Sequence, residues 1–144
     1  LAKSPQALRD AWLPRLVAGE ARVVLAHQER AARYRLEHVT TRAARSGDGW
    51  QIDGEKSLVP IGDQAEAFIV PARVQGGEDD PAGIALFLVE RAAVGITTRG
   101  YALQDASRAA ELPHAITQSP GLQPTGSTAT CFLVDPCSRT TSSR

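Results

Sequence analysis

The side chains in this sequence that could perform acid–base chemistry or bind a metal ion are its histidines and carboxylates. The three histidines, His27, His38 and His114, lie far apart, without the paired spacing of metal ligands. We interpret each as a surface histidine or a hydrogen-bonded histidine of a sheet. Asp79 and Asp80 are the closest carboxylate pair, but they fall in an expected turn, where solvation explains them better than catalysis. We therefore assign no catalytic residue and no metal site.

Motifs for nucleotide binding and nucleophilic catalysis are absent as well. No G-x-G-x-x-G follows a strand pattern, and neither G-x-x-x-x-G-K-[ST] nor G-x-S-x-G occurs. Cys131 and Cys137 form a lone C-x5-C without further zinc ligands, and two cysteines do not make a disulfide framework. A reducing, cytoplasmic location fits these features best.

The net charge of the sequence indicates which classes of partner it could attract. Sixteen basic residues offset sixteen acidic ones, so no global positive field attracts nucleic acid or an anionic membrane. No apolar run reaches the roughly 18 residues of a membrane span, and no signal peptide is visible. We therefore expect no nucleic-acid or membrane partner. A local cluster of arginines is interpreted as part of a solvated face. It comprises Arg30, Arg33, Arg35, Arg42 and Arg45.

The elements that would position any site begin with a helix at residues 4–18. Ser4 is a good N-cap and Pro5 suits the first helical position. Pro14 is expected to break or kink the helix, and Gly19 to end it. One apolar face results, formed by Ala7, Leu8, Ala11 and Trp12. This face has no helical partner in the sequence, so the segment looks like the end of something longer and is a candidate for self-association. The first residue, Leu instead of Met, also suggests processing or a fragment.

Short strands are predicted from residue 22 onward. The turn signals at residues 47–49 and 53–54 predict a three-stranded meander over residues 36–59, with Val39, Thr40 and Thr41 in its first strand. Six or seven strands with a turn every 8–12 residues indicate an all-β barrel or sandwich. The runs with strand character are 22–27, 36–45, 50–52, 55–59, 67–70, 84–89 and 96–98. After residue 112 the chain is rich in Ser, Thr and Pro and is expected to be mostly disordered.

Four segments and a glycine that follows them occur in the order and spacing of one known family. Residues 12–20 are similar to a W-L-P-x-L-x-x-G-E segment, and residues 47–56 to a G-D-G-[WY]-x-[IL]-x-G-x-K hairpin. Residues 65–73 follow A-D-x-[FL]-[IL]-V-x-A-R, and residues 83–89 follow G-I-S-x-F-L-V, after which a glycine, Gly95, is usual. Over residues 12–112 the chain thus resembles the acyl-CoA dehydrogenases.

A narrower likeness lies in residues 24–41 and 100–111. They resemble the A-L-A-x-x-E-P-x-x-R-Y-D-L-x-x-V-x-T and G-Y-x-x-x-D-x-x-R-A-A-E patterns of the pimeloyl-CoA dehydrogenase small-subunit group. The chain departs from these patterns at Arg30, where proline is usual, and at Arg35, where aspartate is expected. The flavin-facing W-I-[TS] of ordinary members is Leu58-Val59-Pro60 here.

The resemblance implies a mainly β fold, a small orthogonal β-barrel or sandwich of six to seven strands. Residues 1–20 correspond to a short helical remnant of the family's N-terminal domain, residues 21–112 to its middle β-domain, and residues 113–144 form an irregular tail. The family binds FAD and dehydrogenates an acyl-CoA thioester. By resemblance, the cofactor-binding candidates are Leu25, Ala26, His27, Leu58, Val59 and Pro60. Pro60 offers neither a hydroxyl nor a backbone N–H to a flavin.

Two functions follow as expectations. The first is a fragment or subunit of an FAD-dependent acyl-CoA dehydrogenase that lacks the domain with the catalytic base. It would act on acyl-CoA once completed by a helical domain or a partner subunit, in a homo- or hetero-oligomer. The second is a non-catalytic β-barrel that serves as a binding or assembly module, or a degenerate, inactive family member.

Overall fold

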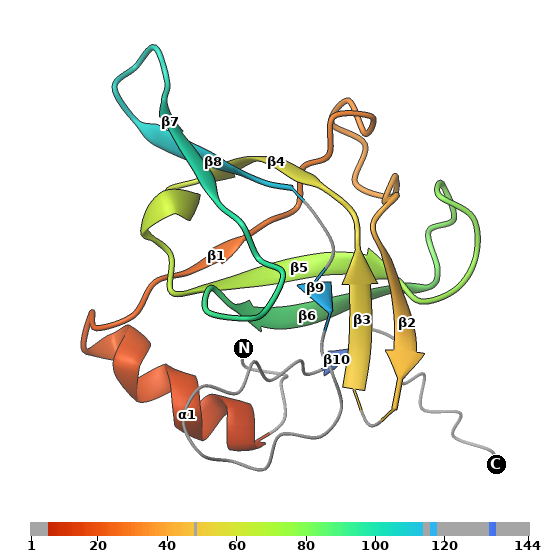
Figure 1. The fold of residues 1–144 in the computed structure, drawn as a ribbon, viewed down its shortest axis with the longest axis horizontal. Coiled ribbons are helices and arrows are strands. Elements are labelled where there is room, and N and C mark those ends of the chain that lie inside the picture. Colours follow the sequence, from red (N-terminus) through yellow and green to blue (C-terminus); the bar gives the residue numbers. More distant parts are fainter. Residues whose placement is uncertain (1–5, 48, 114–115, 118–132, 135–144) are drawn as a thin grey trace, which may run out of the picture.

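Strands β5 (Ala67–Arg73) and β6 (Ile84–Glu90) form the centre of the main sheet (Figure 1). They pair antiparallel along their whole length, and β1 (Val23–Leu25) runs parallel to the first half of β5. All seven residues of β5 are buried or half-buried because the sheet is covered on both faces. The computed structural model describes residues 6–47, 49–113, 116–117 and 133–134.

A hairpin continues the main sheet beyond the far end of β5. It consists of β2 (Arg42–Ser46) and β3 (Gly49–Asp53), which pair antiparallel as the turn signal at residues 47–49 predicts. β2 meets β5 only at Arg73, so the hairpin crosses β5 and β6 steeply in Figure 1. Two short strands lie on the sheet edges: β9 (Ile116–Thr117) pairs with β3, and β10 (Leu133–Val134) pairs with β6. The other residues of the tail expected to be disordered lie outside the described residues, apart from Pro113.

The second sheet has three strands in the order β4, β8, β7. They are β4 (Lys56–Pro60), β7 (Arg99–Ala102) and β8 (Arg108–Leu112), with a short 3-10 helix, η1 (Gly62–Gln64), after β4. β7 and β8 form an arm that projects from the body of the protein (Figure 1). The mainly β fold, with two sheets and a short N-terminal helix, confirms the expected fold class.

The expected meander over residues 36–59 is wrong in its third strand, because β4 pairs with β8 and not with β3. Gly54 makes a corner between the sheets instead of a hairpin turn. Its φ is +154°, and a Cβ atom there would lie 2.5 Å from Thr41 Oγ1, so only glycine fits this close approach.

The strand expected around Val39 is also wrong, since β2 begins only at Arg42. The backbone N–H groups of Thr40 and Thr41 donate to the carboxylate of Glu29, at 2.7 and 3.1 Å. A side chain therefore takes the donors that a strand ladder would use.

Helix α1 (Gln6–Val17) packs against the main sheet. Leu8 and Trp12 are buried together with Leu88 of β6, so the apolar face does have a partner and its expected exposure is wrong. The helix continues through Pro14, whose carbonyl accepts a 2.9 Å bond from Ala18 N, so the expected break does not occur. Gly19, with φ +73°, follows its last turn, and the proposed cap residues 4–5 lie outside the described residues.

The hydrophobic core lies between the two sheets. It includes Phe68 and Phe87, both fully buried, and Trp50 packs edge-on against Phe87 with ring centroids 5.4 Å apart. The guanidinium of Arg45 lies over the Trp50 ring, with its Cζ 4.5 Å from the ring centroid. Trp50 of the β2–β3 hairpin thus packs against the core. Within the described part of the chain, no helix has the length and apolarity to cross a membrane.

Candidate functional site

A cavity of about 560 Å³ lies where the end of β1 approaches β4. We call it the apolar pocket. A turn at residues 32–36 forms its second side. The residues that line it are Val24, Leu25, His27, Gln28, Ala32, Tyr34, Arg35, Leu36, Leu58, Pro60 and Ile61. Five of them are large apolar or aromatic side chains that are exposed to solvent in this chain, namely Leu25, Tyr34, Leu36, Leu58 and Ile61.

The alternation of side chains along the two strand segments decides which predicted residues reach the pocket. Leu25 and His27 line it, as do Leu58 and Pro60. Ala26 and Val59 lie between them in sequence and are fully buried in the core behind the pocket wall. The structure thus brings four of the six flavin-binding candidates to one cavity and turns the other two away from it.

The chemistry of the pocket favours binding over acid–base catalysis. Its volume lies in the range of about 300–1,000 Å³ that is usual for small-molecule sites, and its walls are mostly apolar. Such walls fit a flat aromatic ring such as that of a flavin. Pro60 still has no N–H or hydroxyl to offer, so the fit lies in shape and apolarity. Among the residues that the structure describes, no carboxylate lines this pocket and no cluster of potential metal ligands occurs.

Backbone strain is concentrated around the pocket. Among the described residues, five that are not glycine have positive φ, and Tyr34 (+71°), Leu58 (+50°) and Ile61 (+47°) are three of them. All three line the apolar pocket. A left-handed backbone at such residues costs on the order of 1–3 kcal/mol, and this kind of strain is common at binding sites. A fourth, Arg33 (+45°), precedes Tyr34.

A buried ion pair stands directly behind this wall. Glu29 Oε1 lies 2.6 Å from Lys56 Nζ, and Glu29 also accepts bonds from the backbone and hydroxyl groups of Thr40 and Thr41. Burial would raise the pKa of Glu29, but the hydrogen bonds from Lys56, Thr40 and Thr41 outweigh it and lower this pKa to about 2. Burial lowers the pKa of Lys56, while Glu29 opposes that change. Glu29 is thus a buried carboxylate that joins the segment after β1 to β4 and to residues 40–41.

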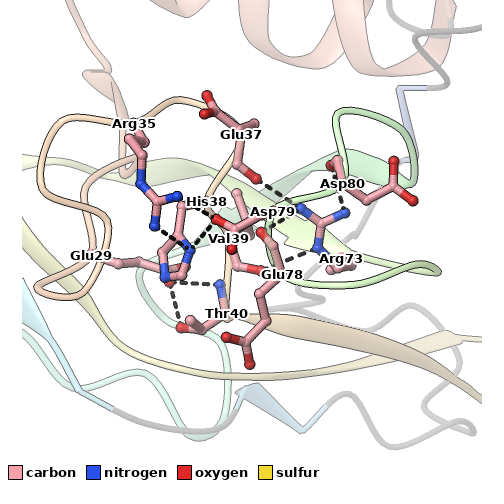
Figure 2. Close-up of polar contacts among 10 residues, drawn as sticks. All are labelled: Glu29, Arg35, Glu37, His38, Val39, Thr40, Arg73, Glu78, Asp79 and Asp80. Carbon is pink, nitrogen blue, oxygen red and sulfur yellow. Dashed lines mark hydrogen bonds and ion pairs between the residues drawn. The ribbon is translucent and has the colours of Figure 1, made fainter.

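Arg73, at the end of β5, fastens two loops to the sheet (Figure 2). Its buried guanidinium uses all five of its N–H donors on backbone carbonyls. Nε donates to Val39 O at 3.2 Å, whereas the Nη atoms donate at 2.8–3.0 Å to Glu37, Glu78, Asp80 and Ala82. One side chain thereby holds residues 37–39 and residues 78–82 together.

The fastened loops bring His38 and Asp79 together beside the pocket (Figure 2). His38 Nδ1 lies 2.7 Å from Asp79 Oδ1, and Arg35 Nη1 lies 2.8 Å from the same oxygen. The hydrogen bond from His38, followed by the charges of Arg35 and His38, lowers the pKa of Asp79 against the opposing effect of burial. His38 is thus buried and lies outside the strands, and its Nε2 has no hydrogen-bond partner among the described residues, so the expected surface or sheet position is wrong. Asp79 lies in a turn with its side chain 59% exposed, as expected, and it also pairs with His38 and Arg35.

Seven of the eleven residues that line the pocket are not among the site residues predicted from the sequence. The turn that carries Ala32, Tyr34, Arg35 and Leu36 belongs to the segment that resembles the family pattern, and its arginines are interpreted as a solvated face, but none of these four residues is predicted to line a site. An exposed tyrosine and an exposed leucine among arginines were the available signal, because large apolar side chains in a polar turn are unusual. His114 and both cysteines lie outside the described residues.

Comparisons with known proteins show which family the chain belongs to. The family model described as "Acyl-CoA dehydrogenase, middle domain" matches residues 25–117. The chain is 35% identical over 82 residues to the long-chain specific mitochondrial acyl-CoA dehydrogenase of Rattus norvegicus, covering 56% of this chain and 19% of that protein. It is 29% identical over 85 residues to a (2S)-methylsuccinyl-CoA dehydrogenase of Cereibacter sphaeroides, covering 59% and 16%.

Solved structures show the same arrangement. The acyl-CoA dehydrogenase of Geobacillus kaustophilus superimposes with a TM-score of 0.72 at 28% identity, over 81% of this chain and 32% of that one. A glutaryl-CoA dehydrogenase of Mycobacterium smegmatis in complex with FADH2 gives 0.68 at 28% identity, over 79% and 30%. The chain spans less than a third of each of these proteins. From its sequence match and its fold, the chain belongs to the acyl-CoA dehydrogenase family and contains the family's middle domain.

Proposed function

We propose that this chain forms the flavin-side wall of an FAD-dependent acyl-CoA dehydrogenase, with the flavin ring in the apolar pocket. The observation that carries the proposal is the convergence of Leu25, His27, Leu58 and Pro60 on one cavity of about 560 Å³. The complex of a structurally similar glutaryl-CoA dehydrogenase with FADH2 supports a flavin as the ligand.

The residues of this chain would bind and shield the cofactor. Leu25, Leu58 and Ile61 provide apolar surface against the ring and exclude water from it, while His27 is a polar group at its edge. A flavin held by these residues would supply the acceptor for the hydride that leaves the β-carbon of the acyl-CoA thioester. Because none of the described residues that line the pocket is a carboxylate, the base that removes the α-proton comes from a helical domain or a partner subunit in this proposal.

One observation favours a non-catalytic role as the second candidate. Pro60 stands where ordinary members have a hydroxyl residue, so this wall lacks a side-chain hydrogen bond to the reactive edge of the flavin. A chain that binds flavin weakly or not at all would then act as a binding or assembly module.

FAD titration calorimetry and the absorbance spectrum of the purified chain separate the two candidates. Flavin binding predicts heat on addition of FAD and visible bands that are released on denaturation. Leu58→Arg, which puts a long charged side chain into the pocket wall, should abolish binding. Leu103→Arg adds the same charge near the tip of the β7–β8 arm, away from the pocket, and should leave binding unchanged. A colourless chain that takes up no FAD would contradict the flavin proposal.

A further inference from the structure

A second hollow of about 610 Å³ adjoins the apolar pocket. We call it the polar pocket. The two share Gln28, Tyr34 and Leu58 in their walls, so Tyr34 and Leu58 form a common boundary. The remaining lining of the polar pocket consists of Glu29, Arg30, Arg33, Ser57, Tyr101 and Glu111. This lining is charged and aromatic, in contrast to the aliphatic walls of the first hollow.

Within the part of the chain that the structure describes, the ion pairs of the polar pocket leave the charge of Arg33 without a partner. Glu29 is paired with Lys56 in the interior. Glu111 is paired with Arg30, whose Nη2 lies 2.5 Å from Glu111 Oε1. Arg33 makes no hydrogen bond or ion pair with any residue that the structure describes. The polar pocket therefore presents a free guanidinium, whose planar set of donors suits a phosphate or a similar oxyanion.

The backbone that carries Arg33 to the boundary between the two pockets is strained. Arg33 and Tyr34 are consecutive residues in the left-handed region, with φ values of +45° and +71°. Neither is a glycine or an asparagine, so the conformation is unfavourable unless the surroundings impose it. Hydrogen bonds from Ala32 N to Glu29 O and from Arg35 N to Ala32 O close the turn on both sides of these residues.

We propose that the two hollows form one bipartite site for an amphiphilic anion. The apolar or aromatic body of the ligand fills the apolar pocket, and its anionic group binds Arg33 beside Tyr34 and Tyr101. Applied to flavins, the site selects a phosphate-bearing flavin over riboflavin, and this application rests on the function proposed above. The anion selectivity itself follows from Arg33 and does not require a flavin.

Two dyes of nearly the same shape test the anion selectivity on the full chain. Anilinonaphthalene sulfonate and phenylnaphthylamine share their aromatic body and differ by the sulfonate, and both fluoresce when bound to apolar sites. The wild type should bind the sulfonate more tightly. Arg33→Gln should weaken sulfonate binding by about tenfold, the value of one charge-assisted hydrogen bond, and leave the neutral dye unchanged.

Two further variants sharpen the result. Arg42→Gln removes the same charge from an exposed position of β2 outside both hollows and should change neither dye. Glu111→Gln releases Arg30 from its carboxylate and should tighten sulfonate binding. Equal affinity of the wild type for the two dyes, or equal losses in Arg33→Gln and Arg42→Gln, would overturn the proposal.

Parallel titrations with riboflavin and flavin mononucleotide keep the two proposals apart. A preference for the mononucleotide that Arg33→Gln removes supports both. Absence of binding by either flavin contradicts the proposed function, and the dye pair then decides the anion site independently.

Discussion

Glu29 and Lys56 form an ion pair in the interior, with 2.6 Å between Oε1 and Nζ and each side chain only 3% exposed. Glu29 follows β1, and Lys56 is the first residue of β4. The pair thus joins the two elements whose side chains line the apolar pocket. Thr40 and Thr41 complete the coordination of the carboxylate, so the same contact also fixes the loop that leads into β2.

Removing one partner of this pair should cost more than removing both. Glu29→Gln leaves the Lys56 ammonium buried without a counter-charge and is expected to lower the free energy of unfolding by about 3–5 kcal/mol. In the double variant Glu29→Gln/Lys56→Met no charge remains buried, so its loss should be smaller than that of Glu29→Gln alone. Urea unfolding followed by circular dichroism measures all variants. A double variant that loses as much as Glu29→Gln alone, or more, would contradict this account.

The low pKa of Glu29 predicts acid sensitivity. Its folded-state pKa of about 2 lies below its ordinary value of 4.5, so the unfolded chain binds more protons in this window. The contribution of Glu29 to stability is therefore full above about pH 4.5 and is lost as the pH falls towards 2. Urea unfolding at a series of pH values should show this loss in the wild type. Glu29→Gln, although less stable, should show a flatter dependence, and identical slopes would contradict the assignment.

Arg73 should not be replaceable by lysine, although the charge is the same. Lysine has three donors and guanidinium has five, so Arg73→Lys leaves at least two of the five carbonyls without their bond. We expect a loss of about 2–4 kcal/mol in unfolding free energy and faster proteolytic cleavage at residues 76–82. Arg42→Lys, at an exposed position, serves as the control. Unchanged cleavage in Arg73→Lys would show that the loop is held by other contacts.

A substitution at Pro60 should strengthen the binding of FAD. Pro60→Thr supplies the hydroxyl and the backbone N–H that proline lacks, and one added hydrogen bond should tighten FAD binding by roughly three- to tenfold. Pro81→Thr, in an exposed loop outside the pocket, should have no effect. Calorimetry with FAD gives both affinities. If Pro60→Thr does not tighten FAD binding, position 60 does not face the flavin.

The sequence predicts those parts of the fold whose causes are local. The β2–β3 hairpin follows from the glycines at residues 47 and 49, and β5 and β6 follow from their long apolar runs. β8 was missed because its Arg-Ala-Ala-Glu-Leu sequence has helical propensity, which pairing with β4 and β7 overrides.

The missed parts of the site depend on long-range contacts. Thr40 and Thr41 are good strand formers, yet the carboxylate of Glu29, eleven and twelve residues earlier, takes their N–H groups. Leu25 and Leu58 could be placed at the pocket from family motifs, whereas Tyr34 reaches it only through a left-handed turn. No local pattern in the sequence predicts a tyrosine in that conformation.

The contact of α1 with the sheet gives a last prediction. Trp12 is 5% exposed and packs with Leu88 and Ala67, so Trp12→Ala removes a large side chain from a closed cluster. We expect it to lower the free energy of unfolding by about 3–5 kcal/mol. Leu13→Ala, on the exposed side of the same helix, should cost less than about 1 kcal/mol. Because the sheet already covers the apolar face of α1, this helix should not drive self-association. Sedimentation should therefore give Leu13→Ala and the wild type the same molecular mass. Similar stability losses in the two variants would show that α1 is not docked through Trp12.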